Sequence, residues 1–429
     1  MSKKIAIIGA GTMGLTAAYY AAKAGHVVTV FEADTQPGGM AAHFDFEGLS
    51  LERFYHFVCK ADLPLFSLLD DLGLASKMRW RPTKMGYFFE GKHYPWGDPL
   101  ALLTFPHLDI ISKIRYGLHA FLSTKRRDWS KLDGLRADEW IKFNIGERAF
   151  DVLWRKLFDL KFFEYAQDIS AAWIWARIKR TGTSRKSIFQ EELGYIDGGS
   201  QTLIDALVAE TEKCGGVIKL GTPTTRIEIE NNRVTGVVAG GQFYAADEVL
   251  STIPVPYIPD IVPDLPVPIL AKYRAQKNIG VVCVVHKLSC KVTDNFWLNI
   301  NDPRIDVPGI IEFSNLRYMG KDNVVYIPYY MPQTHPKFNQ TDAFFVEETL
   351  RYLNQINPDI TSDKVFASKV GRLRYAQPVC GPRFLETLPP INPGIAGLQI
   401  ADTSYYYPED RGISEGARLA KKMAGMIGK

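Results

Sequence analysis

A glycine-rich turn between two apolar runs at the start of the chain restricts its fold more than any other feature. Residues 5–8 are apolar and are followed directly by Gly9-Ala10-Gly11-Thr12-Met13-Gly14. A helix is expected over 15–24, and a second apolar run over 27–31 ends at Glu32, which stands 18 residues after Gly14. Strand, glycine turn, helix, strand and acid in this order are typical of a dinucleotide-binding βαβ unit. The sequence therefore predicts an α/β fold with a Rossmann-like parallel sheet.

Each residue type in this pattern has a physical role. Gly9 permits the tight turn, Gly11 lets the backbone approach a pyrophosphate, and Gly14 lets the helix pack on the strand. The helix offers unpaired N–H groups and a positive dipole end to phosphate. Glu32 is expected to bind ribose hydroxyls and to repel a 2′-phosphate, which argues against NADP. A turn without a ligand is the alternative, and the complete pattern disfavours it. The predicted contacts of this unit are Gly9, Gly11, Thr12, Met13, Gly14 and Glu32.

The composition is that of a globular protein and excludes several other classes. Of 429 residues, 46% are hydrophobic and 23% are charged. The net charge of +4 is dispersed along the chain, so no nucleic-acid partner is predicted. The five cysteines form no Cys-x-x-Cys pair and no zinc-type cluster, so we expect no metal site and a reduced, cytoplasmic setting. The chain has no run of 18 apolar residues, so no membrane-spanning helix is predicted.

Five residues separate Glu32 from the pair Gly38-Gly39. With the preceding unit, this pattern resembles the flavoprotein superfamily of amine oxidases, protoporphyrinogen oxidases, phytoene desaturases and UDP-galactopyranose mutases. The resemblance implies FAD as the cofactor, with Ala33 and the glycine pair near it. The family often has Arg or Lys after the pair, whereas this chain has Met40, so a cation for the phosphates must come from elsewhere.

Two later segments extend the resemblance. Residues 225–227 occupy the position where relatives pass their backbone beside the adenine, which implies Arg226 and Ile227 as contacts. A short strand is expected over 398–401 and ends in Asp402, which the resemblance places on the ribityl chain or pyrophosphate. A helix opening at Gly412-Ile413-Ser414 would point its N-terminus at the flavin N1/C2=O edge, where a helix dipole stabilises negative charge.

The resemblance also predicts the domain organisation. An FAD-binding domain is expected from 1–45, 195–256 and 370–429, and an α+β substrate (cap) domain from 46–194 and 257–369. Within the cap, strands are expected at 280–288, 309–313 and 324–330 as a sheet above the flavin. No second glycine fingerprint is flanked by strand and helix, so no separate NAD(P) domain is expected. Electrons would then enter from a small-molecule substrate and leave to oxygen, a quinone or a redox partner.

Three residues are candidates for catalysis. His56 follows a segment that passes the flavin in relatives, and it is either a proton-transferring or flavin-contacting group or a structural histidine. Tyr407 is expected to border the isoalloxazine, with core packing as the alternative. Arg411 is expected to bind an anion or the cofactor, with an ion pair to Asp410 as the alternative.

The stretch 99–127 has apolar residues at helical spacing and ends in Lys125-Arg126-Arg127. Such a face either packs in the cap core or lies on an anionic membrane. The predicted location is therefore the cytoplasm, with peripheral contact to the inner membrane surface as an open alternative.

The leading hypothesis is an FAD-dependent oxidoreductase: a dehydrogenase, desaturase or oxidase. It would move hydride from a C–H bond of a hydrophobic or lipid-linked substrate to flavin N5. Lys287 is a weak candidate for the amine-oxidase lysine, so amine oxidation is not favoured. One alternative is a UDP-galactopyranose mutase-like isomerase with Arg372, Arg374 and Arg411 on a diphosphate. Another is a flavin-binding partner protein without chemistry of its own.

Overall fold

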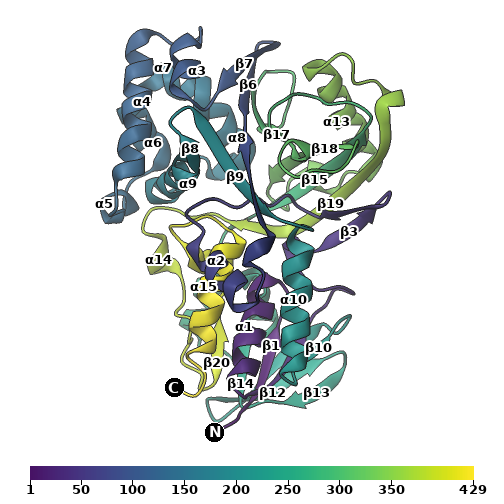
Figure 1. Cartoon of the computed structure of the whole chain (residues 1–429). Helices are drawn as coiled ribbons and strands as arrows, with labels where there is room; N and C mark the ends of the chain where they lie inside the picture. The colour runs from purple at the N-terminus through teal and green to yellow at the C-terminus, as the bar shows by residue number, and fades with distance from the viewer.

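The computed structural model describes all residues, 1–429, as two lobes. The lower lobe in Figure 1 holds both termini and is built around a parallel sheet. The upper lobe has a group of helices on one side and a mostly antiparallel sheet with a covering helix on the other.

The lower lobe contains a five-stranded parallel sheet assembled from distant parts of the chain. Residues Ile5 and Val28 lie opposite each other in the register of the two central strands. Apart from the edge strand Val217–Lys219 and the first residue of each of its two neighbours in sheet order, the strands are mostly buried, because helices cover one face and a small antiparallel sheet covers the other. In sheet order the strands are β10 (Val217–Lys219), β2 (Val27–Phe31), β1 (Lys4–Ile8), β14 (Glu248–Ser251) and β20 (Leu398–Ile400). The predicted class, an α/β protein with a Rossmann-like sheet from discontinuous segments, is confirmed.

Two layers enclose this sheet. The helical layer consists of α1 (Thr12–Lys23), α10 (Ser200–Lys213) and α15 (Ile413–Ala424), with α2 (Leu63–Asp71) packed on α15. The opposite layer is the three-stranded sheet β11 (Thr224–Glu230), β12 (Arg233–Ala239) and β13 (Gln242–Ala245). Next to it lie the short helices α11 (Ile258–Ile261) and α12 (Val267–Ala275) of the proline-rich segment.

The upper lobe contains a seven-stranded sheet in which the strands expected at 280–288, 309–313 and 324–330 are present. Strand β15 (Asn278–Leu288) is buried along its whole length, because α13 (Asp342–Ile356) covers one face and aromatic side chains cover the other. In order the strands are β19 (Val365–Pro378), β15 (Asn278–Leu288), β18 (Asn323–Met331), β17 (Gly309–Glu312), β16 (Trp297–Asn301), β6 (Met85–Phe89) and β7 (Lys92–Trp96).

The helices of the upper lobe lie beside this sheet (Figure 1). They are α3 (Pro99–Thr104), α4 (Ile110–Lys125), α5 (Ser130–Asp133), α6 (Ala137–Ile145), α7 (Glu147–Phe150), α8 (Lys156–Phe162) and α9 (Ala171–Thr183), and α14 (Phe384–Thr387) follows later in the chain. None of the helices in the structure has both the length and the apolar composition needed to cross a bilayer.

Smaller strands connect the lobes. These are the hairpin β3 (His43–Phe46) and β4 (Leu49–Glu52), and the sheet β5 (Met78–Thr83), β9 (Gln190–Ile196) and β8 (Arg185–Ser187). The boundaries expected at 194/195 and 369/370 fall inside β9 and β19. β19 pairs with β15 of the upper lobe along its length.

Candidate active site

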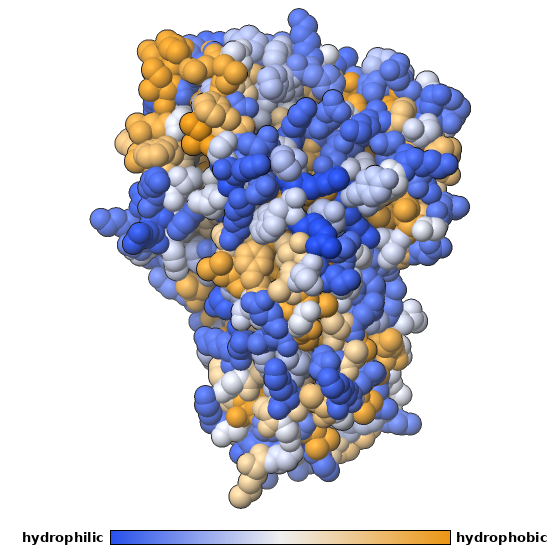
Figure 2. Space-filling view, in the orientation of Figure 1, coloured by the Kyte–Doolittle hydropathy of each residue, from blue (hydrophilic) through white to orange (hydrophobic).

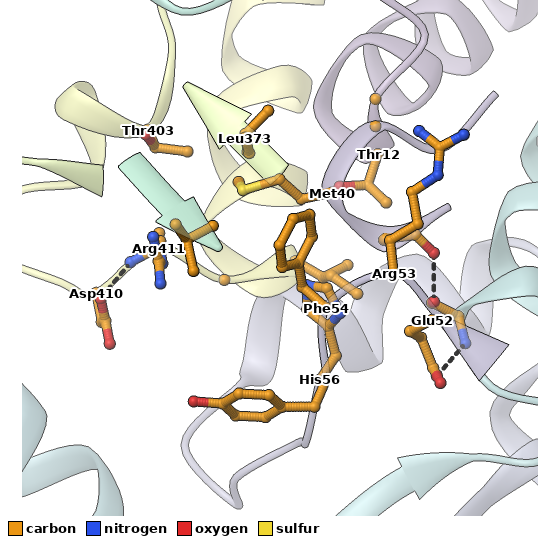
Figure 3. A pocket seen from close by; sticks show the side chains of 18 of the residues that line it. Thr12, Met40, Glu52, Arg53, Phe54, His56, Leu373, Thr403, Asp410 and Arg411 are labelled. Carbon is orange, nitrogen blue, oxygen red and sulfur yellow. Dashed lines mark hydrogen bonds between the residues drawn. The ribbon is translucent and has the colours of Figure 1, made fainter. Parts of the chain in front are cut away.

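A cavity of about 970 Å³ lies between the two lobes. Residues of β1, α1, β2 and the start of α15 line it from below, and residues of α8, α9, β15 and β16 line it from above. In Figure 3, Glu52 and Arg53 lie on one side and Asp410 and Arg411 on the opposite side, with Phe54 and His56 between them. The cavity therefore brings together segments from both ends and the middle of the chain.

The glycine turn forms one end of the cavity. Gly9 has a φ of +98°, and its N–H donates to the Phe31 carbonyl oxygen over 2.8 Å. The Gly38 N–H donates to the Ala10 carbonyl oxygen over 2.7 Å, which brings the glycine pair against the first turn. A Cβ built on Gly11 would meet no protein atom within 4 Å. The backbone at Gly11 is therefore exposed to the cavity, as close approach of a pyrophosphate requires.

Glu32 lies at the end of β2 and lines this part of the cavity. Its carboxylate accepts hydrogen bonds from the Ala10 N–H over 2.6 Å and the Asp34 N–H over 2.9 Å. These bonds hold the carboxylate against the glycine turn. Arg53 also lines the cavity here and forms an ion pair of 2.5 Å with Asp34. It brings a cation to the side where Met40 replaces the family's basic residue, and the sequence interpretation missed it.

The opposite end of the cavity is formed by Asp402 and the start of α15. Asp402 is buried and accepts hydrogen bonds of 2.8 Å from the N–H groups of Val255 and Ser404. Burial raises the pKa of this carboxyl above its ordinary value, although the hydrogen bonds oppose the shift. Gly412, Ile413 and Ser414 line the cavity at the first turn of the helix.

The N-termini of α1 and α15 both face the cavity, and neither has a side-chain cap. First-turn N–H groups without a cap need an acceptor, and they carry the positive end of the helix dipole. Together with the open backbone at Gly11, these two termini fit the pyrophosphate and the flavin ring of FAD. When bound, FAD supplies a two-electron acceptor for hydride.

Most residues predicted to contact the cofactor line the cavity, and four predicted site residues do not. Gly14 packs inside the unit, since a Cβ there would lie 2.8 Å from Thr252 Oγ1 and would overlap the Gly9 carbonyl oxygen. Arg226 instead forms ion pairs with Glu228 and Asp264. The residues lining the cavity are Gly9, Gly11, Thr12, Met13, Glu32, Ala33, Gly38, Gly39, Met40, His56, Asp402, Arg411, Gly412, Ile413 and Ser414, and those outside it are Gly14, Arg226, Ile227 and Tyr407.

The placement of the other two outside residues has a structural cause. Ile227 is completely buried between the small sheet and the parallel sheet, while Pro223 and Thr224, just before it, line the cavity. On the side where the adenine is expected, the cavity is therefore lined by the residues at the start of β11. The Tyr407 hydroxyl hydrogen-bonds Ser170 Oγ over 2.7 Å and donates to Asp133, so this ring is held within the helical part of the upper lobe.

His56 and Arg411 both reach the cavity. The Nδ1 atom of His56 is buried without a hydrogen-bond partner, and desolvation lowers the pKa of the ring to about 4. His56 is therefore neutral at pH 7. Arg411 donates to the Ala376 carbonyl oxygen over 2.5 Å and lies 5.5 Å from the ring centre of Tyr330. Asp410 forms its ion pair with Arg177 at 2.7 Å, not with the Arg411 guanidinium.

Lys161 of α8 lines the same region and was not singled out from the sequence. Its Nζ lies 4.9 Å from the ring centre of Tyr330, and it has no ion-pair or hydrogen-bond partner. Burial lowers the pKa of Lys161 well below its ordinary value, and the nearby charge of Arg177 acts in the same direction. A bound anion would raise the pKa of Lys161 again, because an opposite charge favours the protonated form. In the sequence, the signal for this position is its spacing: Lys161 stands three residues after Phe158 on the same helix, and Phe158 also lines the cavity.

The upper part of the cavity is otherwise largely aromatic and aliphatic. Its apolar wall consists of Phe54, Tyr55, Phe57, Trp154, Leu157, Phe158, Phe162, Ile174, Ile178, Val281, Phe296 and Trp297. Such a surface binds apolar groups by removing them from water.

The buried histidines make stability depend on pH. Burial lowers the pKa values of His56 and His119 to about 4 and that of His286 to about 3, against 6.5 in an unfolded chain. Below pH 6.5 the unfolded chain binds protons that the folded chain does not. Each of the three histidines lowers the free energy of unfolding by about 1.4 kcal/mol per pH unit as pH decreases from 6.5 toward 5. Glu312 opposes one of these contributions, because burial raises the pKa of its carboxyl to about 7, against 4.5 in an unfolded chain. We therefore expect a net fall in the free energy of unfolding that is smaller than the sum over the three histidines. Urea unfolding between pH 7.5 and 5 measures this slope, and a flat profile would contradict it.

Sequence comparison supports what the geometry indicates. Residues 14–403 match the family described as flavin containing amine oxidoreductase. Protoporphyrinogen oxidase 2 of Arabidopsis thaliana is 32% identical over 158 residues, covering 35% of this chain and 31% of that protein. The 15-cis-phytoene desaturase of Synechococcus elongatus is 26% identical over 289 residues, covering 61% and 60%. The Arabidopsis thaliana phytoene desaturase is 23% identical, covering 87% and 69%. The matches thus span less than two thirds of the first two relatives.

Solved structures share the fold over essentially the whole chain. A candidate protoporphyrinogen oxidase from Exiguobacterium sp. 255-15 has a TM-score of 0.76 at 19% identity, covering 100% of this chain and 99% of that one. Putrescine oxidase bound to putrescine has a TM-score of 0.75 at 18% identity, with the same coverage. With 390 consecutive residues matched, 14 to 403, this chain belongs to the flavin containing amine oxidoreductase family.

Proposed function

We propose that this protein oxidises a largely apolar substrate bearing an acidic group, with hydride leaving a C–H bond for flavin N5. The supporting observation is the upper cavity, where an aromatic wall surrounds Lys161 and Arg411. Neither of these side chains has a carboxylate partner, whereas Arg177 is paired with Asp410. Apolar walls with a few fixed polar groups orient a hydrophobic ligand, and an unpartnered cation favours an anion over a protonated amine.

The side chains of the cavity would bind and orient this substrate. The aromatic wall excludes water from the reacting C–H bond, and Lys161 and Arg411 hold the acidic group. His56 is neutral at pH 7 and has a buried Nδ1 atom without a partner. Oxygen, a quinone or a redox protein then receives the electrons.

Two alternatives find less support. Lys287 lies outside the cavity and forms an ion pair of 3.3 Å with Asp322, so it does not supply an amine-oxidase lysine. Of the three arginines expected in a sugar-nucleotide mutase, Arg372 is paired with Asp342 and Arg374 does not line the cavity. The three guanidinium groups therefore do not converge on one diphosphate.

Anaerobic mixing of the FAD-loaded protein with substrates of different chemistry tests the proposal. Phytoene represents a neutral polyene, protoporphyrinogen IX an apolar ring with carboxylates, and putrescine a diamine. We expect the visible flavin absorbance to be bleached fastest by the carboxylate-bearing ring and not by the diamine. Bleaching by putrescine at an equal or higher rate would refute the assignment.

Replacing Lys161 by glutamine tests the acidic group. We expect Lys161→Gln to weaken the apparent affinity for a carboxylate-bearing substrate by about tenfold, since a charge-assisted hydrogen bond is lost. The affinity for a neutral polyene should stay the same. Lys179→Gln is the matched control, because Lys179 lies outside the cavity and contacts the ring of Trp175. An equal loss for both substrates, or the same loss in the control, would contradict the role of Lys161.

A further inference from the structure

Helix α4 has its apolar residues on the outside. Its buried positions are Ser112, His119 and Ser123, all polar. The apolar side chains at helical spacing point outward, with exposed fractions of 67% for Ile111, 62% for Ile114, 55% for Leu118, 58% for Phe121 and 53% for Leu122. A helix on the surface of a protein in water normally has the opposite arrangement. The outer face of α4 is therefore suited to an apolar surrounding.

Neighbouring elements continue this face. On α3, Leu100 is 63% exposed and Leu103 is 56% exposed, and Phe143 at the end of α6 is 83% exposed. The Arg115 guanidinium donates to the Phe143 and Asn144 carbonyl oxygens, which holds the end of α6 beside α4. Figure 2 shows the resulting apolar area at the upper left, over the helices labelled α3 and α4 in Figure 1. We call this area the α3–α4 patch: Leu100, Leu103, Ile110, Ile111, Ile114, Leu118, Phe121, Leu122 and Phe143.

Positive charge borders the patch. Helix α4 has no acidic residue between 110 and 125, and Asp109, before it, accepts the Ser112 N–H as a cap. The basic residues on and after the helix are Lys113, Arg115, Lys125, Arg126 and Arg127. An apolar face with a basic border matches the boundary between acyl chains and anionic headgroups.

We propose that the α3–α4 patch docks on the surface of an anionic lipid bilayer, with the apolar side chains in the acyl boundary and the basic residues among the headgroups. A second copy of this chain is a poorer occupant, because a self-complementary contact would bring identical basic borders together. An apolar area of this extent is unusual on a protein that stays monomeric in water.

Docking would place the cavity one helix away from the bilayer. Helix α9 packs on α4, where the Trp175 Nε1–H donates to the Ser123 carbonyl oxygen over 2.9 Å. The other side of α9 lines the cavity with Ile174, Arg177 and Ile178. A bilayer could thus deliver an apolar substrate to this wall. This consequence rests on the proposed function, whereas the docking itself does not.

Co-sedimentation of the FAD-loaded protein with vesicles tests the docking. The vesicles contain phosphatidylcholine alone or phosphatidylcholine with phosphatidylglycerol, and no substrate is needed. We expect binding to the anionic vesicles and weak binding to the neutral ones. A triple variant of the apolar face should lower the partition coefficient of the protein onto the vesicles by about 100-fold or more. Its substitutions are Ile114→Gln, Leu118→Gln and Phe121→Gln. Lys125→Gln/Arg126→Gln/Arg127→Gln should lower the partition coefficient by about 100-fold on anionic vesicles only.

A matched control uses exposed apolar residues elsewhere. Val267→Gln/Phe366→Gln changes side chains that are 78% and 60% exposed and far from α4 in the sequence, and it should bind vesicles like the wild type. An unchanged flavin spectrum shows that each variant is folded. Light scattering distinguishes the competing occupants: a dimer that the α4 variant dissociates, without vesicle binding, would assign the patch to a second copy and overturn the proposal. A monomer that binds neither vesicle type would also overturn it.

Discussion

Replacing Gly11 by alanine should weaken the binding of FAD without unfolding the protein. Gly11 has a φ of −66°, which alanine adopts readily, and an added Cβ would meet no protein atom within 4 Å. The methyl group would project into the cavity where the backbone must approach the pyrophosphate. We expect the affinity for FAD to fall by about tenfold to a hundredfold, as for a buried overpacking defect. Titration of the apoprotein with FAD, followed by flavin fluorescence, measures this change.

Gly14→Ala is the matched comparison, and it should lower the stability of the fold instead of acting directly on FAD binding. There a Cβ would overlap the Gly9 carbonyl oxygen and crowd Thr252, inside the contact of α1 with the parallel sheet. The gain in helix propensity, about 1 kcal/mol, is too small to offset the overlap. We expect the free energy of unfolding of the apoprotein to fall by about 3 kcal/mol. Equal stability of the two apoprotein variants would contradict this division between a ligand-facing and a packing glycine.

Replacing Glu52 by alanine should destabilise the junction of the two lobes. Glu52 is 2% exposed, forms an ion pair of 3.2 Å with Arg317, and accepts the Ser200 N–H at the start of α10 over 3.2 Å. Its backbone carbonyl accepts the Tyr326 hydroxyl over 2.8 Å. Removing the carboxylate leaves Arg317, which is 13% exposed in its side chain, without its charge partner. We expect a loss of about 3 kcal/mol at pH 7.

The same carboxylate gives this prediction a pH dependence. Burial alone would raise the pKa of Glu52, but His43 and Arg317 lower it to about 2, against 4.5 in the unfolded chain. Its contribution is therefore complete above pH 4.5 and disappears as pH falls toward 2. Urea unfolding should show a smaller difference between Glu52→Ala and the wild type at pH 3 than at pH 7. A difference that grows at low pH would contradict the assignment, and Glu52→Gln, which keeps the volume, separates charge from packing.

The local elements were predictable because short-range rules fix them. An apolar run, a glycine turn and an amphipathic helix between residues 5 and 31 can form only a strand, a turn and a helix in that order. The same holds for the C-terminal strand ending in Asp402 and for the helix opening at Gly412, whose N-terminus must lack partners for its first N–H groups. These segments formed as expected, and they line the cavity at its two ends.

Long-range packing decided the rest. Arg53 and Lys161 reach the cavity from elements whose position depends on the whole upper lobe. Pro223 and Thr224, at the start of β11, line the cavity, whereas Arg226 is held in ion pairs and Ile227 is buried between the two sheets. Tyr407 turned toward Ser170 because a hydroxyl partner was available there in the folded lobe.

Helix α4 is the clearest example of a feature that the sequence could not predict. Its period fixes that apolar residues share one face, but a period is unchanged when the helix rotates about its axis. The core and the surface were therefore equally consistent with residues 99–127. Only the tertiary structure, by packing Ser112, His119 and Ser123 inward against its neighbours, determined that the apolar face points outward. The sequence by itself determined the cofactor-binding unit, because that unit is built from neighbours in the chain.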